Sequence, residues 1–323
     1  MGCHPISVNR LRSAHMLTPE RLTAVRHTLR PIGFAMPSIG LSAVPPVQQQ
    51  IEAARRLEAA GYRNGWANEG VGGKDVFVQI AILLGATDQL TFGTSVTPMW
   101  ARPPMVTHAA AHQLVEAFPD RFLLGLGSGY DFMAPLAGLV YRKPLAQLRE
   151  YVTRMPEPVP LLDVPAVDYP TVVGANGRRS VRQAGEIADG AFPSLVPPRY
   201  VEEIRSVLGD DKLIIVGLMT FVDDDEEKAK GDASQSISQI FAMKGVPYGR
   251  VLDSFGYTAQ DRTEGSDRLT ADLTAAGSGA TIAAAARRYI EAGADHVVLM
   301  PVEADFNSGV DKLESIAADV TAV

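Results

Sequence analysis

Short apolar runs alternate with amphipathic stretches along most of the chain. Eight apolar runs are typical of buried strands, and the segments between them carry the three-to-four-residue spacing of helices. The predicted strands are 32–36, 65–68, 91–96, 122–126, 171–174, 191–195, 213–221 and 296–301, and the predicted helices are 47–60, 75–86, 105–118, 145–153, 179–187, 199–208, 226–243 and 281–292. Strands separated by helices pair in parallel through right-handed crossovers. Eight such units predict an α/β fold closed into a (β/α)8 barrel of the TIM type.

A faint internal repeat agrees with this prediction. The stretch Ala53-Ala-Arg-Arg-Leu-Glu-Ala-Ala-Gly61 resembles Ala285-Ala-Arg-Arg-Tyr-Ile-Glu-Ala-Gly293, and each glycine leads into a predicted strand. Glycine at this place is the usual helix stop. The likeness reflects either a true repeat or the convergence of helix-to-strand connections on one pattern, and both readings require repeated αβ units.

One long polar stretch interrupts the alternation. Residues 242–279 contain Pro247, Gly249, Gly256 and Gly265, so we predict an insertion of short helices over the barrel mouth, before the last helix. Such insertions often gate ligands. We expect residues 1–16 to be an N-terminal tail and 17–323 to be one barrel domain; Met16 is an alternative start.

Composition narrows the class of protein. Of 323 residues, 46% are hydrophobic and 21% charged, which is ordinary for a soluble globular protein. The formal net charge of -7 argues against nucleic acid as a partner, because phosphate binding needs clustered Lys and Arg. The single cysteine, Cys3, excludes an intrachain disulfide and fits a reducing cytoplasm. No apolar run is long enough for a membrane span, so none is expected.

A barrel of this kind keeps its ligand site at the carboxyl ends of its strands. The residues found there are mostly small, hydroxylic, amide or aromatic, which suits a planar uncharged ring and suits hydrolysis poorly. The candidates are Ser38, Asn68, Glu69, Thr94, Ser95, Val96, Trp100, Gly127, Ser128, Gly129, Tyr130, Gly174, Ala175, Asn176, Gly177 and Arg178. The loop 174–178 opens a helix, so it is either an anion site or an ordinary strand-to-helix turn.

Two clusters that could suggest metal binding are discounted. His108, His112 and Glu116 share one helix face, but Ala109 stands where a zinc protease has its glutamate. The acidic run at 223–227 is explained by solvation and by the dipole of a helix start. We therefore predict no metal site.

Three motifs, in their order along the chain, resemble the luciferase-like monooxygenase superfamily, and most closely its deazaflavin branch, the F420-dependent oxidoreductases. They are Gly93-Thr-Ser-Val-Thr97, Arg121-Phe-Leu-Leu-Gly-Leu-Gly-Ser-Gly129 and Gly174-Ala-Asn-Gly177, and the likeness covers about residues 30–302. It implies a TIM-type barrel that binds coenzyme F420 or FMN at the strand ends. It also implies a non-prolyl cis peptide at Ser95–Val96 behind the ring.

The resemblance assigns roles to the rim residues. Gly127, Ser128 and Gly129 would line the ring or its ribityl chain, and residues 174–177 would cradle the phosphate-bearing tail. Two departures stand out. Deazaflavin enzymes that oxidise sugars or alcohols often have an acid followed by His after the second strand, whereas this chain has Glu69-Gly70, which argues against a proton relay there. Arg178 replaces a common proline.

The leading hypothesis is an oxidoreductase in which F420 transfers a hydride to or from a small organic molecule. Glu69 is expected to be the polar group near the substrate, with Asn68, Ser95 and Asn176 fixing the ring, and Glu69 and Asn68 are the candidate catalytic residues. Trp100 and Tyr130 either shape the pocket or simply pack at the rim. The alternatives are an FMN-dependent monooxygenase and a non-catalytic barrel that binds cofactor or serves as a subunit. A homodimer is also expected.

Overall fold

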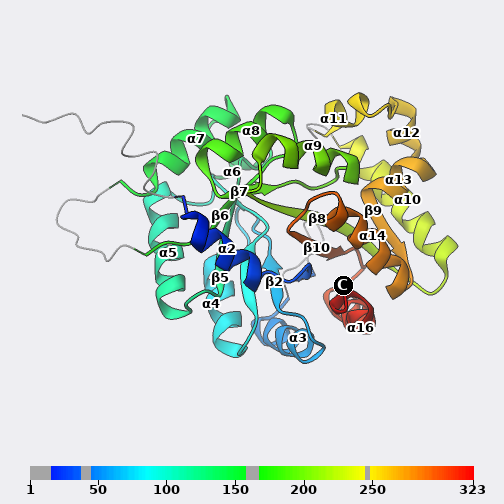
Figure 1. The fold of residues 1–323 in the computed structure, drawn as a ribbon, viewed down its shortest axis with the longest axis horizontal. Coiled ribbons are helices and arrows are strands. Elements are labelled where there is room, and N and C mark those ends of the chain that lie inside the picture. Colours follow the sequence, from blue (N-terminus) through cyan, green and yellow to red (C-terminus); the bar gives the residue numbers. More distant parts are fainter. Residues whose placement is uncertain (1–15, 38–44, 158–166, 244–247) are drawn as a thin grey trace, which may run out of the picture.

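The computed structural model describes residues 16–37, 45–157, 167–243 and 248–323, and within them eight parallel strands close a barrel (Figure 1). Each strand pairs with the next, and the last pairs with both its predecessor and the first, which closes the ring. The predicted TIM barrel is therefore confirmed. The barrel strands are β1 (Ile32–Ala35), β2 (Asn64–Ala67), β3 (Thr91–Thr94), β5 (Phe122–Gly127), β6 (Thr171–Gly174), β7 (Gly190–Phe192), β8 (Leu213–Val222) and β10 (His296–Pro301).

Helices cover the outside of this barrel. All eight predicted helices are present, with ends shifted by a few residues. They are α3 (Val47–Ala59), α4 (Val76–Ala86), α5 (Pro104–Ala117), α7 (Pro144–Arg154), α8 (Arg178–Ile187), α9 (Pro198–Leu208), α10 (Glu226–Ala242) and α14 (Gly279–Glu291). The helix expected to be last, α14, is followed by β10 and then by α15 (Phe306–Ser315) and α16 (Ala317–Thr321). A short helix, α6 (Met133–Leu136), follows β5.

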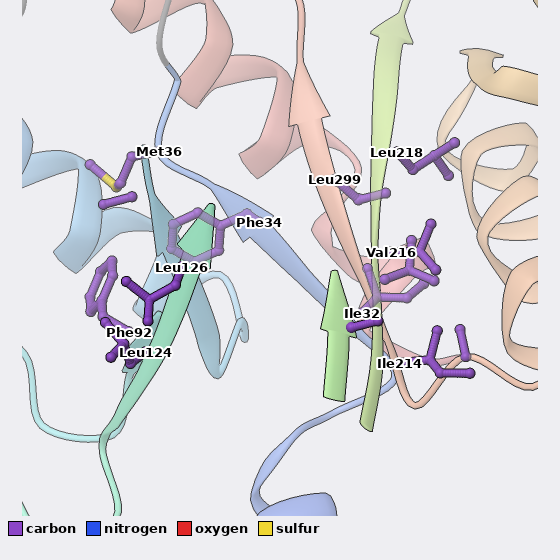
Figure 2. Close-up of a cluster of buried hydrophobic side chains, with 14 of the residues drawn as sticks. Ile32, Phe34, Met36, Phe92, Leu124, Leu126, Ile214, Val216, Leu218 and Leu299 are labelled. Carbon is purple, nitrogen blue, oxygen red and sulfur yellow. The ribbon is translucent and has the colours of Figure 1, made fainter. Parts of the chain in front are cut away.

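Alternate side chains of each strand face the helices. Figure 2 shows this outer layer, to which β1 contributes Ile32 and Phe34 and β8 contributes Ile214 and Val216. The Phe34 ring packs edge-on against Tyr62, with centroids 5.2 Å apart. Burial of this layer is the main force that holds helices to strands.

The strand residues between these face the barrel interior, where the rings of Trp66, Phe192 and His296 lie among aliphatic side chains. Trp66 is 1% exposed and donates from Nε1 to Nε2 of His296 at 3.0 Å. A Cβ on Gly93 would lie 2.2 Å from the Trp66 ring, and one on Gly33 would lie 2.7 Å from His296. These strand glycines therefore make room for large interior side chains. Burial lowers the pKa of His296 to about 4, so its ring is neutral.

An additional helix, α2 (Pro19–Thr28), closes the amino end of the barrel. Its Leu22, and Leu29 just beyond its end, join the interior cluster with Leu123 of β5. The chain before α2 is fixed by Asp189, whose carboxylate accepts from Leu17 N at 2.8 Å. The helix α2 was not among the predicted helices.

The predicted insertion contains short helices and a strand that was not predicted. The helices are α11 (Gly249–Ser254), α12 (Ala259–Glu264) and α13 (Asp267–Leu273), grouped beside α10 at one side of the molecule (Figure 1). The strand is β9 (Thr274–Gly277), which pairs with the carboxyl half of β8 from Met219 to Val222. The division into a tail and a single domain stays a prediction.

Candidate active site

A break in the sheet between β3 and β5 forms the centre of the candidate site. These strands pair at Phe92 and Gly93, and the short strand β4 (Thr97–Pro98) resumes the pairing farther along β5. Between β3 and β4, Ser95 and Val96 leave the hydrogen-bonded pairing with β5. The peptide bond that joins these two residues is cis, as the resemblance implied. Thr94 bridges the gap, because its Oγ1 donates to Gly125 O and accepts from Gly125 N, both at 2.7 Å.

The Val96 side chain lies close to the ends of β5 and β6, at Gly127 and Gly174. A Cβ on Gly127 would lie 2.5 Å from Val96 Cγ2, and one on Gly174 would lie 3.6 Å from the same atom. Position 127 therefore requires glycine as long as Val96 stays in place. The neighbouring hydroxyl of Ser95 is buried and has no hydrogen-bond partner in the described part of the chain. An unpaired buried hydroxyl at a glycine-lined rim is a feature that a polar ligand atom can satisfy.

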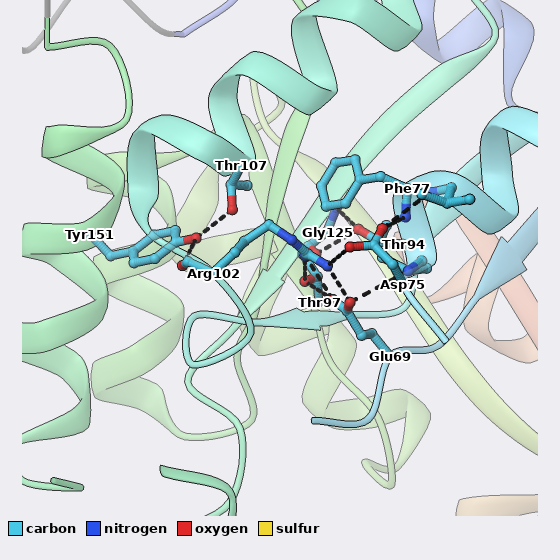
Figure 3. A network of polar contacts seen from close by, with 11 residues as sticks. Glu69, Asp75, Phe77, Thr94, Thr97, Arg102, Thr107, Gly125 and Tyr151 are labelled. Atoms are coloured by element: carbon cyan, nitrogen blue, oxygen red, sulfur yellow. Dashed lines mark hydrogen bonds and ion pairs between the residues drawn. The ribbon is translucent and has the colours of Figure 1, made fainter. Parts of the chain in front are cut away.

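Beside this break, Glu69 forms a buried ion pair with Arg102, shown in Figure 3. Arg102 Nη1 donates to Glu69 Oε2 at 2.9 Å, and Nη2 donates to Oε1. Thr97 Oγ1 also donates to Glu69 Oε2. Glu69 is 5% exposed. Both carboxylate oxygens thus accept hydrogen bonds from the loop that follows the break.

Two further groups complete this network. Arg102 Nη2 donates to Asp75 at 2.7 Å, and Tyr151 OH donates to Arg102 O at 3.0 Å. Burial opposes the charge on Arg102, but Glu69 and Asp75 outweigh it and raise the pKa of the guanidinium. Burial likewise opposes ionisation of Asp75, yet the backbone N–H groups of α4 and Arg102 lower the pKa of its carboxyl.

The sequence did not point to Arg102 or Asp75 as site residues, and Thr97 was noted only as part of the motif 93–97. The candidates were residues that adjoin predicted strand ends, whereas Arg102 lies several residues beyond β4. The available signal was a carboxylate, Glu69, predicted to be near the rim and in need of a cation. Asp75 was recognisable as a helix N-cap, and it accepts from Phe77 N at 2.9 Å.

The loop after β5 is held in place by side-chain contacts. Trp100 is 6% exposed, and its Nε1 donates to Ser128 O at 2.6 Å. Gly129 has φ of 59°, a left-handed conformation that favours glycine. Tyr130 OH lies 2.9 Å from Tyr248 OH, which links this loop to the inserted segment, and burial raises the pKa of Tyr248 well above its usual value.

The loop after β6 is also held by its own contacts. Asn176 Oδ1 accepts from Ser194 N at 2.8 Å, and Gly177 N donates to Ser180 Oγ at 3.0 Å. Arg178 pairs with Glu203 at 2.9 Å on the surface, so its charge is already partly offset. Ala175 is buried.

The remaining candidates lie apart from these contacts. Asn68 is exposed directly after β2, and Ser38 lies outside the described residues. The discounted histidine pair belongs to α5, where His108 Nδ1 lies 2.6 Å from Tyr169 OH. Across the four described segments, no group of three His, Cys, Asp or Glu side chains could hold a metal ion. None of the described helices is long and apolar enough to cross a membrane.

Comparisons with known proteins agree with the geometry. The sequence model of luciferase-like monooxygenases matches residues 31–296. A 5,10-methylenetetrahydromethanopterin reductase of Methanolobus tindarius is 24% identical over 236 residues, which are 65% of this chain and 72% of that protein. A reductase of the same name from Archaeoglobus fulgidus is 24% identical over 184 residues, and there the chain spans about half of the relative, 54%.

Solved structures resemble this one in fold. An F420-dependent secondary alcohol dehydrogenase in complex with an F420-acetone adduct superimposes with a TM-score of 0.69 at 17% identity, over 90% of this chain and 99% of that one. The oxygenating constituent of 3,6-diketocamphane monooxygenase of Pseudomonas putida, in complex with FMN, gives a TM-score of 0.68 at 16% identity, over 91% and 98%.

Proposed function

The chain belongs to the luciferase-like monooxygenase family, and from that premise we propose that it is an oxidoreductase that uses coenzyme F420 to transfer a hydride to or from a small organic molecule. The named activity of the Methanolobus reductase supports the choice of a reductase. The F420-bound dehydrogenase supports it only through its fold. The proposed site is the rim formed by the loops after β2, β3, β5 and β6.

One observation carries this proposal: the glycine-lined rim around Val96 next to the unpaired Ser95 hydroxyl. Because Gly127 and Gly174 have no side chains, the half-buried Val96 side chain lies over them, and it offers an apolar surface against which a flat ring can lie at van der Waals distance. Ser95 Oγ can form a hydrogen bond to a polar atom on the edge of that ring. The residues present therefore fit a deazaflavin or flavin ring.

Each rim segment would have its own part in binding. Ser95, Val96 and Thr94, which fixes them, would support the ring, and residues 127–129 would line the ring or its ribityl chain. Residues 174–178 would hold the phosphate through backbone N–H groups at the start of α8. Ser38 and Asn68 complete the proposed set. When bound, the deazaflavin supplies a hydride-carrying carbon, and the protein orients the substrate and excludes water.

Glu69 remains a proposed site residue, with a more specific role. Because both of its oxygens accept hydrogen bonds from Arg102 and Thr97, it is occupied by protein donors. We propose that Glu69 acts as a positioning residue, which holds Thr97 and so fixes the bulge at Ser95 and Val96. Trp100 and Tyr130 would then bound the substrate side of the rim.

Titration of the purified protein with F420 and with FMN, in separate experiments, tests the proposal. We expect tight binding of F420, seen as a change in its fluorescence, and weak or no binding of FMN. Preference for FMN would support the monooxygenase alternative. If neither cofactor binds, the proposal is wrong and a non-catalytic barrel is favoured.

We also propose that the protein is a homodimer in the cytoplasm. The neighbouring helices α4 and α5 expose Val78, Met105 and Val106 by 59%, 39% and 52%, and a second copy would cover them. The single cysteine suits a reducing compartment. Light scattering should give a dimer that V78E/V106E converts to a monomer. The control Val207→Glu, on exposed α9, should stay dimeric.

A further inference from the structure

A groove of about 660 Å³ runs between α7 and α8 on the outside of the barrel. The two helices lie side by side (Figure 1). The volume is in the range of pockets that hold small ligands, roughly 300–1,000 Å³. Four arginines and two glutamates dominate its lining, which consists of Leu145, Ala146, Arg149, Glu150, Thr153, Arg154, Arg179, Arg182, Gln183 and Glu186.

The charge of this groove is not balanced by its own residues. Arg149 pairs with Glu186, and Arg154 lies 3.9 Å from Glu150 and 3.4 Å from Glu157. Arg179 and Arg182 have no ion pair or hydrogen bond in the described part of the chain. Arg179 and Arg182 therefore bring two positive charges to the groove without an acidic partner, although the whole chain has a formal net charge of -7.

The position of these two arginines is electrostatically unfavourable in the absence of a ligand. They lie three residues apart, on one face of the first turns of α8. Like charges at this spacing repel each other, and cations are disfavoured near a helix N-terminus. An anionic ligand in the groove would relieve both effects, so the charge pattern and the cavity point to the same chemistry.

We propose that this groove binds a flexible chain of carboxylates, namely the oligoglutamate tail that coenzyme F420 carries beyond its phosphate. The inference rests on the proposed function. The N-cap of α8 is Gly177, the end of the loop proposed to hold the phosphate. A tail that leaves the phosphate along α8 meets Arg179 first and Arg182 about 4.5 Å farther along the helix axis. Each guanidinium can bind one carboxylate through two N–H groups.

The test compares three forms of the cofactor on the full chain. They are F420 with several glutamates, the form that keeps the phosphate and lactyl group but has no glutamate, and the deazaflavin riboside without phosphate or tail. Dissociation constants are measured by fluorescence for the unmodified protein and for R179Q/R182Q. The control R287Q/R288Q removes the same charge from α14, and circular dichroism checks that both variants fold.

Because exposed charge pairs contribute roughly two- to fivefold in affinity each, we expect R179Q/R182Q to weaken binding of the glutamylated form about 4- to 25-fold. Binding of the two forms without glutamates should not change, and added salt should reduce the difference. Equal weakening of all three forms, or no effect on the glutamylated form, would overturn the inference while F420 binding itself stands. Failure of the unmodified protein to bind any form would overturn the proposed function and the inference with it.

Discussion

The Glu69–Arg102 ion pair is almost excluded from water, with side-chain exposures of 4% and 9%. Removal of one partner leaves the other charge buried, which typically costs about 3–5 kcal/mol. We therefore expect Arg102→Met to lower the free energy of unfolding in urea by about that amount. The double variant E69Q/R102M should lose clearly less than the sum of the two single variants.

Arg149→Gln serves as a control for this comparison of single and double variants. Its ion pair with Glu186 is exposed, at 39% and 59%, so its loss should cost less than about 1 kcal/mol. Strictly additive losses for Glu69 and Arg102 would mean that the two side chains are not coupled, and the positioning role proposed for Glu69 would then have no basis.

Two adjacent hydroxyls, Ser95 and Thr94, should respond in opposite ways to removal. Ser95 Oγ is buried without a partner, so Ser95→Ala should leave the free energy of unfolding unchanged or raise it by up to about 1 kcal/mol. The same change should weaken F420 binding, because the proposed contact to the ring is lost. Thr94 Oγ1 joins both backbone groups of Gly125, so Thr94→Val should destabilise by about 1–3 kcal/mol.

Denaturation curves and fluorescence titrations on the two variants measure both quantities. A Ser95→Ala protein that is much less stable, with cofactor affinity unchanged, would contradict the role proposed for this hydroxyl.

His296 makes stability depend on pH. Its pKa is about 4 in the folded protein because of burial, against about 6.5 in an unfolded chain. The contribution of neutral His296 to the free energy of unfolding is therefore complete above about pH 6.5. This contribution, up to about 3 kcal/mol, is lost as pH falls toward 4. Burial raises the pKa of Asp189 to about 6, so that residue has the opposite effect, with stability lost as pH rises from about 4 to 6.

The effects of His296 and Asp189 fall in overlapping pH ranges. We therefore compare the pH dependence of the free energy of unfolding between the unmodified protein and His296→Gln. His296→Gln does not titrate but can still accept from Trp66. Between pH 7.5 and 4.5, the unmodified protein should lose more free energy of unfolding than His296→Gln, by about 2–3 kcal/mol. Parallel pH profiles would show that His296 does not stay neutral in the folded state.

At the scale of elements, apolar periodicity located every barrel strand, because strands buried on both faces are continuous apolar runs. It did not locate the break between β3 and β4, since the predicted strand 91–96 continues into it with the same residue types. The strand β9 was missed because Thr-Ala-Ala-Gly has low strand propensity and forms only by pairing with β8. The helix α2 did have a signal, Thr18-Pro19-Glu20, typical of a helix start.

The candidate site was predictable to a similar degree. Element order fixes which loops share the rim, and this was enough to bring Val96, Gly127 and Gly174 together. The partners of Glu69 were not predictable, because an ion pair between two loops depends on the path of each loop. The unpaired side chains in the α7–α8 groove were also invisible in the sequence, since all its arginines look alike there.

At the scale of the whole molecule, the two ends of the barrel differ in structure. The amino end is closed by α2, whose Leu22 packs into the interior cluster. The carboxyl end carries the glycine-rich loops and the buried ion pair. In barrels of this type, residues at the closed end contribute to stability and residues at the open end to ligand binding.

This separation can be measured with one substitution at the closed end. Leu22 is 4% exposed, so Leu22→Ala should lower the free energy of unfolding by about 2–5 kcal/mol through lost burial and a cavity. The dissociation constant for F420, measured well below the unfolding temperature, should stay within about twofold, because α2 lies at the other end of the barrel from the rim. Ser95→Ala should give the reverse combination. If Leu22→Ala weakened cofactor binding as strongly as it weakens the fold, the interior rings around Trp66 would be transmitting the change along the barrel axis, and the two ends would not be independent.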